Sequence, residues 1–159
     1  MSSPKQRGAI TMFDSTTLYD QSTFYKAFEC DLLSAQQEVI IESPFITERR
    51  MNVLLPIFTK MRRRNVRIIV NTRNPQEHDG DYYYQALNAV VAMQDLGIIV
   101  LYTTGHHRKL AIIDRRIAYE GSLNILSFSD SCEIMRKMVS ETIAMQLCKF
   151  IAIDRYIRR

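Results

Sequence analysis

The sequence predicts an α/β domain built on one mixed β-sheet with helices on both faces. Helix-like and strand-like segments alternate from about residue 22 to residue 103, which is typical of parallel strands joined by helical crossovers. Later strand-like segments are joined by very short turns, which parallel strands cannot use, so antiparallel pairing is expected there. The chain has 159 residues, of which 47% are hydrophobic and 24% charged, and this suffices for one core of ordinary size.

Two helices are expected in the first part of the chain. Residues 22–35 have apolar side chains at i, i+3 and i+4 spacing, and Ser22 can cap the start of this helix. A second helical stretch runs from Thr47 to Arg64. Pro56 should kink or restart it, because proline has no N–H to donate and its ring crowds the preceding turn.

Two more helices are expected further along. Residues 86–96 form the first of them, and Gly97 can end it because glycine readily adopts the left-handed conformation. Residues 140–159 are predicted to form a long closing helix. Its core face is expected to hold Ile143, Leu147, Ile151 and Tyr156.

The strands are marked by short runs of β-branched residues bounded by turn formers. One boundary, residues 73–81, is a loop dense in such turn formers. In open sheets of this class, functional groups collect at strand ends and in the loops beyond them. Strands are expected at residues 38–43, 66–72, 98–103, 109–114, 116–121 and 133–138.

The chain is expected to form one domain over residues 17–159, preceded by a loose polar segment over residues 1–16. No apolar run approaches the ~20 residues that a membrane helix needs. Lys5 and Arg7 are followed by no apolar stretch, so no signal peptide is expected. The sequence therefore predicts a protein that does not act through a membrane span.

Three cysteines, Cys30, Cys132 and Cys148, are an odd number without the spacing of a metal site. They are expected to be reduced thiols, which indicates a cytoplasmic protein. Cys30 and Cys148 lie among apolar residues of predicted helices and are expected in the core. No metal and no cofactor is expected.

The net charge of +4 and the pI of about 9.0 are mildly basic, but the basic residues are bunched. Two interpretations remain open: solvated helix ends and turns, or attraction to a polyanion such as nucleic acid. The bunches are Arg49–Arg50, Arg62–Arg63–Arg64, Arg115–Arg116, Arg136–Lys137 and Arg158–Arg159.

A group of polar residues is predicted to converge around the stretch GHHRKLAIID. His107 and Lys109 are two positions apart, so in extended chain they point the same way, whereas His106 points the opposite way. Ser122 and Asn124 are also two apart, just after a predicted strand. If the two strands are neighbours, an imidazole, an ammonium, a hydroxyl and a carboxamide meet, which are groups that attack or bind a phosphate.

Taken singly, each of these residues would be expected to be an ordinary solvated surface residue. The joint pattern H-x-K-x4-D-x6-G-S-x-N is different, because it would arise by chance on the order of once in several hundred thousand such chains. It is formed by His107, Lys109, Asp114, Gly121, Ser122 and Asn124.

This pattern resembles the signature of the phospholipase D superfamily. The resemblance runs from about Thr17 to the C-terminus and includes TFYKAFECDLLSAQQEVIIESPFIT and HRKLAIIDRRIAYEGSLNILS. The sequence is most similar to the single-motif endonucleases and to the phospholipase D-like domains appended to helicase-like ATPases. The motif is specific for the superfamily and less specific for the substrate.

The resemblance implies a covalent mechanism without metal. His107 would attack phosphorus and form a phosphohistidine, while Lys109, Asn124 and Ser122 would hold the non-bridging oxygens. A second histidine would protonate the leaving oxygen. His106 faces away and only one motif copy is present, so the second imidazole is expected from a homodimer partner.

Three further residues are assigned with the resemblance. Glu133 is the expected carboxylate that orients the imidazole of His107, with Asp130 as the alternative. Asp114 completes the motif, and its parity predicts a structural role rather than contact with substrate. Arg73 follows a strand and can touch a backbone phosphate, although a solvated loop arginine is the competing interpretation.

These residues predict a phosphodiesterase or endonuclease that acts on nucleic acid, with DNA preferred over RNA. One alternative is a nucleic-acid-binding accessory domain of a helicase or ATPase with weak or no cleavage. Another is a phospholipid-headgroup hydrolase, which the short chain and the lack of an amphipathic membrane helix disfavour.

Overall fold

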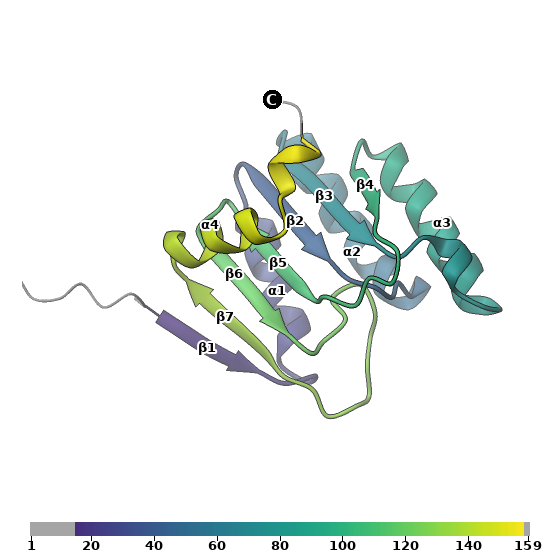
Figure 1. Ribbon diagram of the computed structural model, residues 1–159, viewed down its shortest axis with the longest axis horizontal. Coiled ribbons are helices and arrows are strands. Elements are labelled where there is room, and N and C mark those ends of the chain that lie inside the picture. Colours follow the sequence, from purple (N-terminus) through teal and green to yellow (C-terminus); the bar gives the residue numbers. More distant parts are fainter. Residues whose placement is uncertain (1–14, 158–159) are drawn as a thin grey trace, which may run out of the picture.

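The computed structural model describes residues 15–157 and contains one seven-stranded mixed sheet (Figure 1). The strand order is β1-β7-β6-β5-β2-β3-β4. The elements are β1 (Ser15–Tyr19), α1 (Phe24–Ser34), β2 (Glu38–Glu42), α2 (Glu48–Arg63), β3 (Arg67–Thr72), α3 (Asp81–Asp95), β4 (Ile99–Tyr102), β5 (Leu110–Ile113), β6 (Ile117–Gly121), β7 (Met135–Val139) and α4 (Glu141–Phe150).

The sheet changes direction at β2. Strands β2, β3 and β4 are parallel to one another, whereas β5 pairs antiparallel with β2, and β6, β7 and β1 continue antiparallel. The parallel strands are linked through helices and the β5–β6 pair by a tight turn. The predicted mixed sheet is therefore confirmed.

Helices cover both faces of the sheet, as predicted. Val39 and Ile41 pack with the core under α1, α2 and α3, whereas the intervening Ile40 packs under α4 (Figure 1). This alternation is the period of two that an extended strand imposes. Every residue of β2 is buried, so this strand is the centre of both cores.

The turn between β5 and β6 consists of Asp114 and Arg115, both with positive φ (51° and 52°). The N–H of Arg116 donates to the carbonyl of Ile113 at 3.0 Å, which closes a turn with the handedness that tight hairpins favour. Residues other than glycine are strained in this conformation. The strain is offset by the contacts of both side chains described below.

The start of α1 differs from the prediction. Ser22 does not cap the helix, since the N-cap position is Thr23. The carboxylate of Asp20 instead accepts the N–H groups of Ser22 at 2.9 Å and of Thr23 at 3.0 Å. In the second helix, the chain continues through Pro56 as a single helix and does not restart.

Two helix boundaries were also predicted wrongly. Helix α3 begins at Asp81, five residues before the predicted start at residue 86. The closing helix ends at Phe150 because Ala152 adopts a left-handed φ of 54°. As a result Tyr156, expected in the core, is exposed, and Ile157 is buried.

The start of β1 and the exposure of Cys30 also differ from the prediction. Strand β1 begins at Ser15, inside the segment 1–16 that was expected to be loose, and residues 1–14 lie outside the described residues. Cys148 is buried as expected, but Cys30 is exposed rather than in the core. Within residues 15–157, no helix has the length and apolar character needed to cross a bilayer.

The aromatic centre of the larger core gives a test of the packing. Phe28 is fully buried, with its ring centroid 5.3 Å from both Phe24 and Tyr119. Phe28→Ala should lower the free energy of unfolding by about 4 kcal/mol, because it leaves a cavity in this cluster. The matched control is Leu33→Ala on the exposed side of α1, which should cost less than about 1 kcal/mol. Equal urea-unfolding midpoints for the two variants would contradict this packing.

Candidate active site

His107 and Lys109 lie side by side in the segment that leads from β4 into β5. Lys109 Nζ is 3.0 Å from His107 Nδ1, and it also donates a hydrogen bond to the His107 carbonyl oxygen at 2.9 Å. His107 is exposed, while the adjacent His106 is buried on the opposite side. The predicted alternation therefore separates the two histidines as expected, and it places an imidazole and an ammonium together at one end of the sheet.

The charges of Glu133 and Arg73 act on this ammonium. Partial burial lowers the pKa of Lys109, the carboxylate of Glu133 opposes this, and the guanidinium of Arg73 adds to it. Arg73 is not a solvated loop residue, because its Nε donates to the carbonyl oxygen of His106 at 2.7 Å and its guanidinium lies over the ring of Phe45. The arginine thus holds the backbone beside His107.

The glycine of the motif is required by a close approach of two strands. A Cβ on Gly121 would lie 2.3 Å from the carbonyl oxygen of Ile134, a distance that real Cβ atoms essentially never show. The next residue, Ser122, uses its hydroxyl to accept the N–H of Ile134 at 3.0 Å. Ser122 was predicted to bind substrate; in the structure it lines the groove beside His107, and its oxygen also holds the end of β6 against the start of β7.

Asn124 and Glu133 lie at the two ends of the connection between β6 and β7. Asn124 Oδ1 is buried and has no hydrogen-bond partner among residues 15–157. Glu133 accepts a hydrogen bond from the Ser131 hydroxyl at 3.0 Å. Nδ1 of His107 contacts Lys109. Within the described part of the chain, no hydrogen bond joins the His107 ring to Glu133.

Asp114 was predicted among the catalytic residues, but it lies at the opposite end of β5 from Lys109. Its carboxylate accepts the backbone N–H groups of Gln36, Gln37 and Glu38 at 2.9, 2.8 and 3.0 Å. The parity argument for a structural role agrees with this position. Through these three bonds Asp114 ties the α1–β2 connection to the β5–β6 turn.

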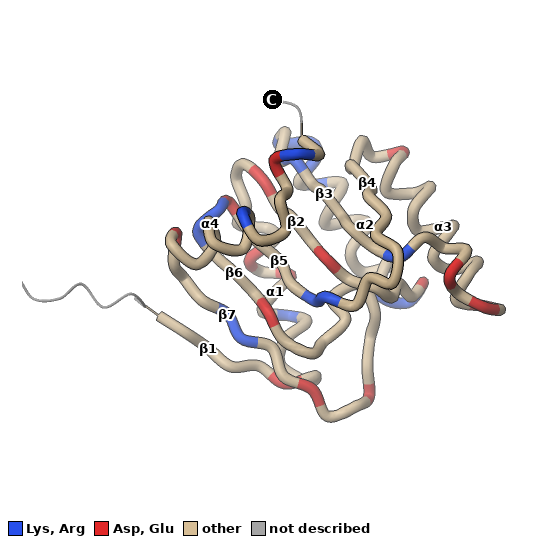
Figure 2. Tube along the Cα trace, viewed as in Figure 1, with Lys and Arg blue, Asp and Glu red and all other residues tan. Residues whose placement is uncertain are grey.

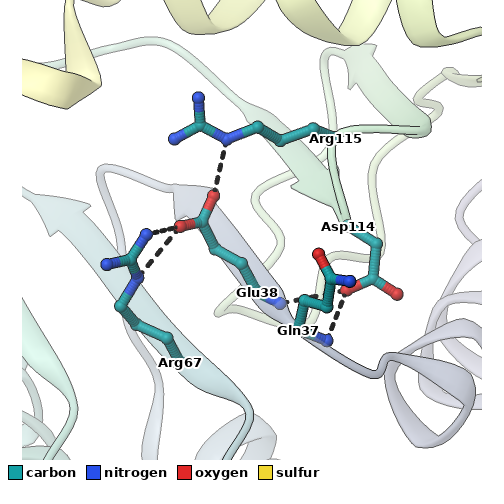
Figure 3. A pocket seen from close by; sticks show the side chains of 5 residues that line it. All are labelled: Gln37, Glu38, Arg67, Asp114 and Arg115. Atoms are coloured by element: carbon teal, nitrogen blue, oxygen red, sulfur yellow. Dashed lines mark hydrogen bonds and ion pairs between the residues drawn. The ribbon is translucent and has the colours of Figure 1, made fainter. Parts of the chain in front are cut away.

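A cavity of about 480 Å³ lies at this far end of the sheet (Figure 3). Its charges are paired with one another: the Glu38 carboxylate accepts from Arg67 and from Arg115, and Arg115 also pairs with Asp154. This network belongs to the fold, and Asp114 is the one predicted site residue among those that line the cavity.

A second hollow, of about 560 Å³, opens beside His107 and Lys109. Ser122 lines one side, and Leu147 and Phe150 of α4 line another. The Phe150 ring is exposed, and the guanidinium of Arg108 lies 5.8 Å from its centroid. The arrangement offers a nucleophilic imidazole and a cation at the floor of an open groove with one apolar wall.

A buried carboxylate behind this segment was missed by the sequence analysis. Glu42 ends β2 and is 1% exposed, and both of its oxygens accept hydrogen bonds from Arg108. The run EVIIES was assigned to a strand by its β-branched residues, and the charged residues that flank that apolar run were not considered. A glutamate inside a fully buried strand was the available signal, since such a charge needs a partner.

The match to known proteins now decides the family. Residues 29–153 match the family model described as "Cardiolipin synthase, PLD-like domain". The chain belongs to the phospholipase D-like domain family. The match includes the whole H-x-K-x4-D-x6-G-S-x-N pattern, so the resemblance predicted from His107 and Lys109 is confirmed. No curated protein matches the sequence.

Solved structures with this phospholipase D-like fold are similar in shape at low identity. NucT from Helicobacter pylori is 16% identical, with a TM-score of 0.69 over 86% of this chain and 92% of that chain. Nuc from Salmonella typhimurium, a phospholipase D family member, is 15% identical, with a TM-score of 0.68 over 86% and 90%. A polyphosphate kinase from Porphyromonas gingivalis has a TM-score of 0.69 at 13% identity, over 91% of this chain and 26% of its own. At these identities the likeness establishes the fold alone.

Within residues 15–157, the basic bunches of this phospholipase D-like domain are spread over several helices, strands and turns. Figure 2 shows Lys and Arg distributed over many elements with Asp and Glu between them. Members of four bunches bond inside the domain, and Arg158–Arg159 lies outside the described residues. The internal pairs are Arg50 with Glu29, Arg62 with the carbonyls of Leu96 and Val66, Arg115 with Glu38 and Asp154, and Lys137 with Asp31.

The position of Asp114 gives a test that separates structure from chemistry. Asp114→Ala should lower the free energy of unfolding by about 3 kcal/mol, because it strands three N–H groups and places alanine at a positive φ. Asp114→Asn, which keeps one acceptor oxygen, should lose about half as much. Hydrogen exchange of residues 104–109 should stay at the wild-type rate in both variants. A selective rise in that segment would place Asp114 in the active site after all.

Proposed function

We propose that this domain is a phosphodiesterase that cleaves nucleic acid, DNA in preference to RNA, through a phosphohistidine intermediate. The observation that carries the proposal is the 3.0 Å contact between His107 Nδ1 and Lys109 Nζ on the floor of an open groove. A phosphate that enters the groove meets a nucleophile and a cation at once. Membership of the phospholipase D-like family and the resemblance to single-motif endonucleases support the same chemistry.

The contact between Lys109 and His107 also sets the order of events. An ammonium can only donate, so a neutral His107 ring that accepts at Nδ1 holds its own proton on Nε2. A bound phosphate gives the ammonium a charged partner and draws it from Nδ1. The ring proton can then reside on Nδ1, where Glu133 is the proposed acceptor, and Nε2 is free to attack phosphorus.

Two displacements complete the reaction. The bond from phosphorus to the leaving oxygen breaks as the bond to His107 forms, and a second imidazole gives its proton to that oxygen. Water then attacks phosphorus, the bond from phosphorus to His107 breaks, and the water gives a proton to the same second imidazole. Lys109 and Asn124 hold the non-bridging oxygens while charge develops on them. Arg73 acts by holding the backbone at His106.

The second imidazole is proposed to come from His107 of the partner subunit in a two-fold dimer. His106 is buried behind the segment, and His78 is buried against Phe45. An isologous dimer brings two copies of one surface together, so the two exposed His107 rings face one phosphate site. One ring of the pair then acts as the nucleophile and the other as the proton donor to the leaving oxygen.

The metal-free reaction is tested with plasmid and single-stranded DNA in EDTA. Wild-type protein should cleave, and His107→Ala should lose activity by at least about 1,000-fold, because the covalent route is removed. Because His107 is exposed, the variant should melt like the wild type, which controls for folding. No cleavage of any DNA or RNA by a verified dimer would disprove the proposal.

Sharing of one site by two subunits is tested by mixing. When equal amounts of wild-type and His107→Ala chains are refolded together, only about one quarter of the dimers hold two intact histidines. Activity should therefore fall to about one quarter of that of wild-type protein at the same total concentration. Activity at one half would show that each subunit works alone.

Two alternatives from the sequence stay open. The first is an accessory domain of a helicase or ATPase that docks on nucleic acid with weak or no cleavage. Equal DNA affinity of wild type and His107→Ala, with no turnover in either, would establish it. The description of the matching family as cardiolipin synthase favours a phospholipid-headgroup hydrolase, which release of glycerol or choline from vesicles would reveal.

A further inference from the structure

The segment that carries His107 contacts one buried carboxylate, that of Glu42. Side chains alternate along it: His107 and Lys109 face the groove, the buried His106 faces Glu42, and Arg108 lines the groove while its guanidinium reaches back to Glu42. Arg108 Nε donates to Glu42 Oε2 at 2.7 Å, and Arg108 Nη2 donates to Oε1 at 3.0 Å. His106 Nε2 lies 3.6 Å from Oε2. Both neighbours of His107 in the chain therefore meet the same buried group.

Glu42 is itself fixed by the sheet. It ends β2 and pairs in register with Leu110, the first residue of β5. Asn71 of the adjacent β3 donates its amide to Glu42 Oε1 at 3.4 Å, and the Thr103 hydroxyl donates to Asn71 at 3.0 Å. Glu42 thus links the ends of β2 and β3 to the segment that begins at Thr103.

The charges around Glu42 favour one arrangement. Burial lowers the pKa of His106, with Glu42 opposing this and Arg108 and Arg73 adding to it. The imidazole of His106 is therefore neutral near pH 7, and Arg108 is the cation that balances the carboxylate. A bidentate guanidinium–carboxylate pair fixes direction as well as distance. Removal of one partner from a buried pair leaves an uncompensated charge, so the segment cannot turn without a large penalty.

We propose that Glu42 is a positioning residue for the reaction: by accepting two hydrogen bonds from Arg108 and packing beside His106, it keeps His107 against Lys109 and aimed into the groove. The catalytic part of this inference rests on the proposed phosphodiesterase function, whereas the holding of the segment does not. The adjacent histidines His106 and His107 therefore have different roles. His107 meets the substrate, and His106 packs against the carboxylate that positions it.

The same strand supplies a matched control. Glu38 lies four residues earlier on β2, is also buried, and accepts hydrogen bonds from two arginines, Arg67 and Arg115 (Figure 3). Glu38→Gln and Glu42→Gln therefore remove the same charge from the same kind of environment at opposite ends of one strand. Effects on stability should be similar, and only Glu42→Gln should affect the His107 segment.

The experiment measures turnover of bis(p-nitrophenyl) phosphate and hydrogen exchange of residues 103–110. Glu42→Gln should lower kcat about 100-fold with KM within about twofold, the size expected for a misplacement of about 1 Å. Exchange in the segment should rise about 10-fold, because the segment opens locally. Glu38→Gln should leave both within about twofold of wild type. Glu42→Asp, which keeps the charge, should recover part of the loss.

The outcomes separate the two proposals. Unchanged exchange and kcat in folded Glu42→Gln, or equal losses in Glu38→Gln, would overturn the positioning role. If the wild type turns over no phosphodiester, the proposed function fails, and a rise in exchange confined to Glu42→Gln still supports the holding of the segment. If Glu42→Gln does not fold, Arg108→Lys applies the same test from the exposed end, since lysine keeps the charge but not the fork. It should then show a smaller rise in exchange and fall in kcat, and wild-type values would overturn the role.

Discussion

The pairing of β5 with β2 is the constraint on which the rest of the site depends. Because β5 runs antiparallel to β2, its first residue lies opposite the last residue of β2, in the pair Leu110 and Glu42. Because β6 runs antiparallel to β5, its end at Gly121 returns to the same edge. Three strand ends therefore meet, and the segment before β5 is surrounded by chain on two sides. The positions of the groove, the buried carboxylate and the imidazole–ammonium pair all depend on the convergence of these three strand ends.

The alternation of side chains in extended chain was enough to predict which way the side chains around His107 point. It separated His106 from His107, placed Lys109 beside His107 and gave Asp114 a structural role, because each of these follows from parity alone. Alternation does not identify the residues that a side chain contacts elsewhere in the fold. The Ser122 hydroxyl is engaged by Ile134 and the backbone at His106 by Arg73, and both contacts come from residues far away in the sequence.

The fold was predicted best where apolar periodicity is strong and worst at polar or strained ends. Strand β1, with the sequence STTLY, lies at the sheet edge with little burial and so lacks an apolar pattern. The closing helix ends where Ala152 turns left-handed, which no helix-stop residue announces. The two interpretations of the basic bunches could not be separated from the sequence for another reason. The positions of arginines in a sequence do not distinguish an arginine that donates to carbonyls inside the domain from one that faces solvent.

The two-residue turn after β5 has a consequence for which histidine meets the groove. Backbone strain is commonly found where chemistry occurs, yet here the left-handed pair Asp114 and Arg115 lies at the end of the sheet away from His107. Three N–H groups fasten Asp114 to the start of β2, and these bonds add to the β2–β5 ladder that fixes the register of β5. A slip of one position would invert every side chain of β5 and exchange inside for outside in the segment before it. The motif aspartate thus supports, together with the ladder, the register in which His107 and not His106 faces outward.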